Sequence, residues 1–134
     1  MSINIIPKVP AIVRLLDACR TSSRRPKKIR KGIDYCDATY ESIYALMETQ
    51  QWKCAETNIP FLLLERRLTV AETNELGLNR LNLPSIDRID NNKGYTMDNI
   101  KIVTLAYNNL KNRYDEVYVR EWIELIKSDN RNNT

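Results

Sequence analysis

The stretch from residue 83 to 111 contains the side chains that are best placed to do chemistry. Two short apolar runs, at 83–89 and 100–103, flank a polar loop that contains Gly94, and a segment of helical character follows. This order predicts a strand, a loop, a second strand and a helix. In such a unit, the hairpin and the helix bring their polar side chains to face each other.

Carboxylate and amide side chains stand at the positions where this hairpin and helix would meet. They are Asp87, Asp90, Asn99, Asn108 and Asn112, with Arg88 among them. Carboxylate and amide oxygens are the hard ligands that suit Mg²⁺ or Mn²⁺, and a guanidinium pairs with phosphate. The residue types therefore predict a site for one divalent metal ion and a phosphate.

The same stretch resembles the HNH endonucleases, the ββα-metal or His-Me finger superfamily, and in particular their phage-type members. The matching segments, which occur in the family's order, are Asp87-Arg88-Ile89-Asp90, Lys93-Gly94-Tyr95, Asp98-Asn99-Ile100 and Asn108-Asn109-Leu110-Lys111. Upstream, residues 52–61 resemble the family's Cys-Ala-x-Thr-Gly-x-Pro segment, with Asn58 where glycine is usual. The resemblance covers roughly residues 39–114. In one departure, Arg88 stands at the position of the catalytic histidine, and the chain contains no histidine.

The resemblance implies a role for each candidate residue. Asp87, Asn108 and Asn112 would hold the metal ion, and Asn99, counted with the catalytic set, would support the loop through hydrogen bonds to its backbone. Arg88 stays protonated, so it can stabilise charge on a phosphate but cannot act as a base. Catalysis would then use a metal-bound hydroxide or Asp90 as the base, unless the domain has lost catalysis.

Several of these residues also have a structural interpretation. Taken alone, a carboxylate such as Asp87 inside an apolar strand is expected to form an ion pair with Arg88 or another base. Asn108 and Asn112 also fit ordinary polar surface near a helix end. Cys54 is expected to be buried as a small hydrophobe beneath the hairpin, because no histidine can activate its thiol.

A dense basic segment lies upstream of this unit. Its members are Arg24, Arg25, Lys27, Lys28, Arg30 and Lys31. The net charge of the whole chain is +4, so the remainder is close to neutral. We expect the segment to contact DNA phosphates, together with Lys93 and Lys111 of the HNH-like unit; the alternative is a solvated linker.

The composition indicates one globular domain. The chain has 134 residues, of which 43% are hydrophobic, and no apolar run approaches the length of a membrane span. The three cysteines form no C-x-x-C pair, and together with the lack of histidine this nearly excludes a structural zinc site. A reduced protein inside a bacterial or phage-infected cell is the simplest interpretation, with no signal peptide expected.

The predicted fold class is α+β, with a ββα-metal core and flanking helices at both ends. Residues 1–38 are expected to form an N-terminal helix, over 10–20, and a basic arm that is an exposed connection. Residues 39–134 are expected to form the HNH-like domain, beginning with a helix that Thr39 caps. Between that helix and the hairpin, the apolar run 59–64 is expected to form a turn that leads into a strand.

A helix is also predicted near the C-terminus. Val119, Trp122, Ile123 and Ile126 recur at helical spacing, so this helix is expected to pack on the core.

The leading hypothesis is a metal-dependent DNA endonuclease of HNH type, similar to phage-encoded or homing-type enzymes, that hydrolyses phosphodiester bonds. The alternative is a catalytically degenerate HNH-fold module that only binds DNA. An RNA- or ribosome-associated basic protein is disfavoured by the few aromatic residues and the lack of an RNA-binding motif. Duplex DNA, contacted mainly through its backbone, is the expected partner. A homodimer stays open, and no membrane contact is expected.

Overall fold

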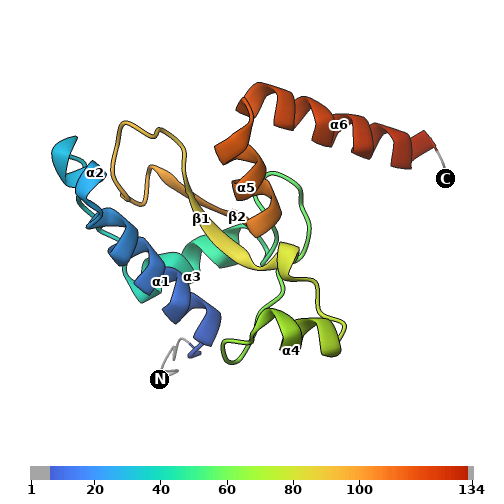
Figure 1. The fold of residues 1–134 in the computed structure, drawn as a ribbon, viewed down its shortest axis with the longest axis horizontal. Helices are drawn as coiled ribbons and strands as arrows, with labels where there is room; N and C mark the ends of the chain where they lie inside the picture. Colours follow the sequence, from blue (N-terminus) through green and yellow to red (C-terminus); the bar gives the residue numbers. More distant parts are fainter. Residues whose placement is uncertain (1–6, 133–134) are drawn as a thin grey trace, which may run out of the picture.

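The computed structural model describes the backbone of residues 7–132 and the side chains of residues 7–129. Within these residues, six α-helices and one two-stranded antiparallel sheet form an α+β fold (Figure 1). The helices are α1 (Pro10–Ser23), α2 (Pro26–Arg30), α3 (Tyr40–Thr49), α4 (Val70–Glu75), α5 (Leu105–Arg113) and α6 (Glu116–Asn132). The strands are β1 (Pro84–Arg88) and β2 (Ile100–Thr104), and a short 3₁₀ helix, Arg80–Asn82, precedes β1. None of the helices described is long and apolar enough to span a membrane.

The hairpin and the helix after it lie where the sequence pattern predicts them. β1 and β2 pair with Asp87 opposite Lys101, and α5 begins directly after β2. Successive side chains of a strand point to opposite faces. Asp87 therefore points towards α5, where it meets Lys111, and Arg88 points away, towards the ring of Tyr95.

The loop between the two strands depends on a close approach at Gly94. A Cβ built at this position would lie 2.7 Å from the side chain of Tyr35 and 2.9 Å from the carbonyl oxygen of Ile33. The loop is tied to the same segment by the amide of Tyr95, which donates to the carbonyl of Tyr35. Only glycine lets the loop backbone approach the 33–35 segment this closely.

Helix starts follow from local capping. Thr39 accepts a hydrogen bond from the amide of Ser42, whose side chain accepts one in return from the amide of Thr39, so the predicted cap of α3 is confirmed. The side chain of Thr104 caps α5 in a similar way, by accepting from the amide of Tyr107. These caps set the point at which the chain turns from extended to helical backbone.

One buried cluster joins the N-terminal helix to the hairpin and the C-terminal helices. It includes Ile12, Leu15, Leu16, Ile43, Met47, Cys54, Ile100, Ile102, Val103, Tyr107, Val119 and Ile123. Cys54 is 2% exposed and accepts a hydrogen bond from the amide of Thr104, so its expected burial beneath the hairpin is confirmed. Asn58 has φ of 63°, a region that asparagine tolerates better than most residues.

Three local expectations differ from the structure. The basic arm is not simply a connection: it contains α2, which begins at Pro26, a residue whose fixed φ suits a first helical turn. The run 59–64 forms no strand beyond one isolated antiparallel bridge, of Pro60 with Lys53, because the next amide, of Leu62, donates to the carbonyl of Asn82 instead of extending that pairing.

The third difference concerns α6. Val119 and Ile123 are buried, whereas Trp122 is 53% exposed and Ile126 is 43% exposed. α6 packs against α5 and extends away from the rest of the fold (Figure 1). The prediction that this helix packs on the core is therefore correct for Val119 and Ile123 and wrong for Trp122 and Ile126.

Candidate functional site

A cleft of about 510 Å³ lies between α1 and α2 on one side and β1 and α5 on the other. Its basic lining residues are Arg14, Arg25, Lys28, Arg67 and Arg88, and its one acidic lining residue is Asp87. Asn108 and Asn112 also line it, from one face of α5. The structure thus brings together four residues predicted from the sequence for the site, Asp87, Arg88, Asn108 and Asn112.

The positive charges of the cleft repel one another. Burial, and after it repulsion from Arg67, lowers the pKa of Arg14. Burial, followed by repulsion from Arg88 and Arg25, lowers the pKa of Lys28. Because a bound anion would relieve this repulsion, the cleft is electrostatically suited to an anionic ligand.

Asp87 is held between two lysines. Its side chain is 5% exposed, and its Oδ1 lies 2.7 Å from the Nζ of Lys111, which is 8% exposed. Its Oδ2 lies 3.6 Å from the Nζ of Lys101, the residue opposite it in the hairpin. The ammonium of Lys111 also donates to the carbonyl of Arg88 at 2.9 Å. The carboxylate is therefore neutralised within the protein by residues other than Arg88.

Asn108 and Asn112 are positioned by α5, one turn apart. The Nδ2 of Asn108 donates to the Oγ of Ser85 at 2.7 Å, and this bond orients the amide against β1. Asn112 is exposed at the lining of the cleft. A hydrogen bond from Nδ2 leaves the amide oxygen of Asn108 able to accept from, or coordinate, a ligand.

These residues do not fit a divalent ion in the arrangement described. The donor set contains one carboxylate, and Lys111 already places a positive charge at hydrogen-bonding distance from it. A metal ion at Asp87 would have to displace that ammonium, because like charges at such a distance repel strongly. Among the described residues, no group of three or more His, Cys, Asp and Glu side chains could hold a metal ion. One feature favours a ligand: the Oδ2 of Asp87 is buried and accepts no hydrogen bond from the described residues.

Three residues assigned to catalysis from the sequence make structural contacts in the loop between β1 and β2. Asn99 is 4% exposed, and its side chain donates to the carbonyls of Asp90 and Gly94 and accepts from the amide of Asp90. This geometry agrees with the supporting role expected for Asn99. The side chain of Asp90 accepts from the amide of Asn92, and Asp90 is not among the residues that line the cleft.

Arg88 contacts the loop between β1 and β2 and also lines the cleft. Its guanidinium donates to the carbonyls of Asn91 and Lys93, and its Cζ lies 5.2 Å from the centre of the Tyr95 ring. The Nζ of Lys28 lies 5.4 Å from the same ring. Tyr95 thus contacts two cations, and Arg88 remains part of the cleft lining.

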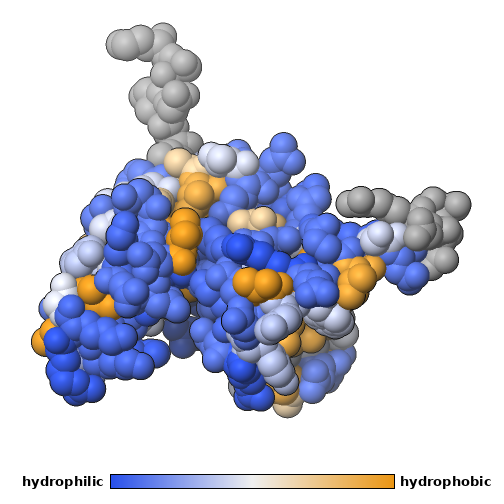
Figure 2. Space-filling view, turned by 90° about the horizontal axis from the view of Figure 1, so that it is seen from above, coloured by the Kyte–Doolittle hydropathy of each residue, from blue (hydrophilic) through white to orange (hydrophobic). Residues whose placement is uncertain are grey.

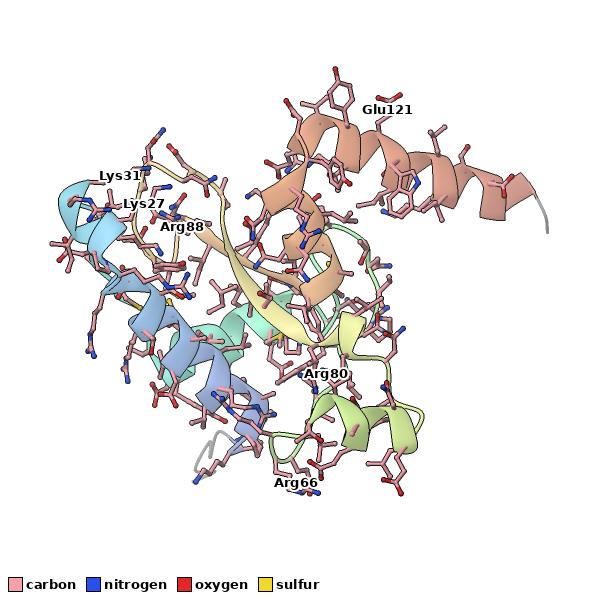
Figure 3. All side chains as sticks on the ribbon, in the orientation of Figure 1. Lys27, Lys31, Arg66, Arg80, Arg88 and Glu121 are labelled. Carbon is pink, nitrogen blue, oxygen red and sulfur yellow. The ribbon has the colours of Figure 1, made fainter. Side chains whose placement is uncertain are left out.

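The remaining basic residues expected to contact DNA lie outside the cleft. Arg24, Lys27, Arg30, Lys31 and Lys93 are exposed. Figure 3 shows Lys27 and Lys31 at the end of the molecule where α2 lies beside the loop between the strands, close to Arg88. Lys111 is different, because its ammonium is buried against Asp87.

Several residues that the structure places at the site were not predicted from the sequence. Arg14 comes from α1, and Arg67 comes from the segment before α4. In the sequence, Arg14 stands out as a basic residue between the apolar residues Val13 and Leu15 of α1. Lys101 was missed as well; it stands opposite Asp87 in the register of the hairpin.

A second charged network lies behind Asp87. Glu56 accepts from Lys101 at 2.5 Å and from Arg120 at 3.1 Å, and Arg120 also pairs with Glu116 at 2.9 Å. Burial raises the pKa of Glu56, but the hydrogen bonds from Lys101 and Arg120 outweigh it and hold that pKa below its ordinary value. This network ties α6 to the strand that carries Lys101.

No protein-family model, curated protein or solved structure matches this chain. The function of the chain is therefore inferred from the contacts of the cleft and from the sequence motifs.

Proposed function

We propose that this protein binds duplex DNA, with backbone phosphates held in the cleft between α1 and the β1–α5 unit. The observation that carries the proposal is the excess of positive charge there: five basic side chains line the cleft, against one carboxylate. That carboxylate, Asp87, is itself neutralised by Lys111 and Lys101. A polyanion is the ligand that such a surface attracts.

The arrangement of charge along the molecule supports a backbone rather than a small anion. Lys27 of α2 and Lys31, just after its end, lie beside the loop between the strands, close to Arg88 of the cleft lining (Figure 3). The face drawn in Figure 2 is largely hydrophilic, with hydrophobic residues in a few separate patches. The resemblance of residues 83–111 to HNH endonucleases adds support for DNA, because the DNA backbone is what that family contacts.

Binding can be tested with a labelled duplex oligonucleotide and fluorescence anisotropy over a range of salt concentrations. Arg67→Ala removes a lining residue of the cleft, and Arg66→Ala removes the neighbouring exposed arginine, which pairs with Glu72 outside it. We expect Arg67→Ala to weaken binding and to flatten the slope of log affinity against log salt by about 0.9 if one phosphate contact is lost. Arg66→Ala should match the wild type. Equal effects of the two variants would refute binding in this cleft.

As a second function, we propose that the same cleft hydrolyses phosphodiester bonds in a reaction that depends on divalent metal, Mg²⁺ or Mn²⁺. One observation favours it: the buried Oδ2 of Asp87 accepts no hydrogen bond from the described residues, and Asp87 lines the cleft with Asn108 and Asn112. The proposal requires Lys111 to leave Asp87. HNH-like chemistry at Asp87 is the hypothesis that the family resemblance implies.

Supercoiled plasmid distinguishes the two functions. Hydrolysis predicts that wild-type protein converts it to open-circle or linear DNA with Mg²⁺ or Mn²⁺, that EDTA blocks the conversion, and that Asp87→Asn abolishes it. DNA binding alone predicts intact plasmid under every condition and an affinity for duplex that EDTA does not change. Cleavage by Asp87→Asn at the wild-type rate would remove Asp87 from the proposed reaction.

A further inference from the structure

Two of the three cysteines lie in direct contact. The Sγ of Cys19 and the Sγ of Cys36 are 3.2 Å apart and share a hydrogen bond, although the residues are 17 positions apart along the chain. Cys19 is buried in α1 and Cys36 is half-buried in the segment after α2. Thiols that meet in this way need only a small movement to join as a disulfide.

Both cysteines stand on well-anchored backbone. Cys19 belongs to α1 and is part of the buried core. Cys36 pairs with Tyr95 in a short parallel bridge, and the amides of Tyr95 and Asp37 donate to the carbonyls of Tyr35 and Tyr95 on either side of it. The contact between the two sulfurs is therefore fixed by the fold rather than by the arm that joins them.

The arm between the two cysteines carries α2 and the cationic residues of one wall of the cleft. Arg25 and Lys28 line the cleft from this arm. The Nζ of Lys28 lies against the ring of Tyr95, next to Cys36 in the fold. A covalent link from Cys19 to Cys36 would close the arm into a loop and hold these side chains at the cleft.

We propose that Cys19 and Cys36 form a site of thiol–disulfide exchange, whose substrate is a low-molecular-weight disulfide such as oxidised glutathione. The thiolate of Cys36, the more exposed of the two residues, attacks one sulfur of the small disulfide. Its S–S bond breaks, one small thiol leaves, and a mixed disulfide forms on Cys36. Cys19 then gives up its proton and attacks the Sγ of Cys36, and the second small thiol leaves. The protein loses two electrons and two protons, which the two small thiols carry away.

The order of attack follows from the surroundings of the two sulfurs. Burial, and after it the hydrogen bond with Cys36, raises the pKa of the Cys19 thiol. Cys19 is therefore protonated at neutral pH and is a poor first nucleophile. Held against Cys36, it is well placed for the second step, because ring closure needs no encounter in solution.

Cys54 provides the matched control. It is also buried, but its sulfur accepts from the amide of Thr104 beneath β2, and no contact with another cysteine is found among the described residues. Its thiol should stay reduced under conditions that oxidise the other two.

The test is to incubate purified protein with oxidised glutathione, then to count thiols in denaturant and to map the bond by mass spectrometry of tryptic peptides. We expect the count to fall from three thiols to one, with a Cys19–Cys36 bond found and no glutathione retained. The oxidised protein should unfold roughly 5–10 °C higher, since the bond restricts the unfolded arm. Cys54→Ser should show the same shift, with its thiol count falling from two to none.

Variants of the pair separate the steps. Cys19→Ser should stop at a glutathione adduct on Cys36 and show no rise in melting temperature, and Cys36→Ser should take up no glutathione. The proposal would be overturned by three remaining thiols in wild type, by a bond that involves Cys54, or by an intermolecular bond. None of these readouts depends on DNA binding, so failure here leaves the function of the cleft untouched.

Discussion

Replacing Lys111 by methionine tests how the carboxylate of Asp87, in the lining of the cleft, is held. The substitution keeps much of the apolar stem but removes the ammonium that donates to Asp87 at 2.7 Å and to the carbonyl of Arg88 at 2.9 Å. Asp87 would then be a buried charge with one remaining cationic neighbour, Lys101, at 3.6 Å.

The expected loss of stability follows from that arrangement. Removing one partner of a buried ion pair costs about 3–5 kcal/mol, because the other charge stays buried without its partner. Lys101 retains part of the compensation, so we expect the lower end of that range, about 3 kcal/mol. For a chain of 134 residues this corresponds to a melting temperature lower by roughly 10 °C.

Thermal unfolding at pH 7, followed by circular dichroism, measures the effect. Asp87→Asn together with Lys111→Met removes both charges and should recover most of the lost stability. Lys93→Met, which removes an exposed lysine, should leave the melting temperature unchanged. An unchanged melting temperature in Lys111→Met, or a double variant as unstable as the single one, would refute the ion pair as the holder of Asp87.

The same variant reports on metal binding. With Lys111 removed, Mn²⁺ should raise the melting temperature of the protein, and the rise should disappear in the double variant that lacks the Asp87 carboxylate. In the wild type, Mn²⁺ must compete with the ammonium, so the rise should be much smaller. A large rise in the wild type that depends on Asp87 would show that Lys111 yields to the metal, and would strengthen the hydrolase proposal.

Three further perturbations have expected outcomes. Gly94→Ala should destabilise the protein by about 1–3 kcal/mol in urea unfolding, because its Cβ would lie 2.7 Å from the side chain of Tyr35 and 2.9 Å from the carbonyl oxygen of Ile33. The lowered pKa of Glu56 means that its pairing stabilises the fold above its ordinary value of 4.5 and stops doing so as the pH falls through the lowered value. Glu56→Gln should therefore flatten the loss of stability in acid, and an unchanged pH profile would contradict this. The pKa of Lys28 is lowered from its ordinary 10.5, so Lys28 loses its charge at a lower pH than a free lysine, and DNA affinity should fall as the pH rises through that lowered pKa. Arginine stays charged at this pH, so Lys28→Arg should move the fall in affinity to higher pH in anisotropy titrations.

The sequence by itself determined the elements whose signals are local. The apolar runs at 83–89 and 100–103 predicted β1 and β2, and Thr39 predicted the start of α3. Alternation along β1 was enough to separate the face of Asp87 from that of Arg88. Such features depend on the backbone and on near neighbours, so a single stretch of sequence contains the information.

The tertiary structure decided which charges meet. Lys111 and Lys101 neutralise Asp87, and Arg14 and Arg67 join Lys28 in one cleft, although these residues come from separate segments. Nor could the sequence show that Cys19 and Cys36 touch, since their contact depends on how α1 packs beside the loop at Tyr95. Each of these contacts depends on the distance between the side chains and on their burial. The sequence cannot give either quantity, because folding of the core brings these remote side chains together.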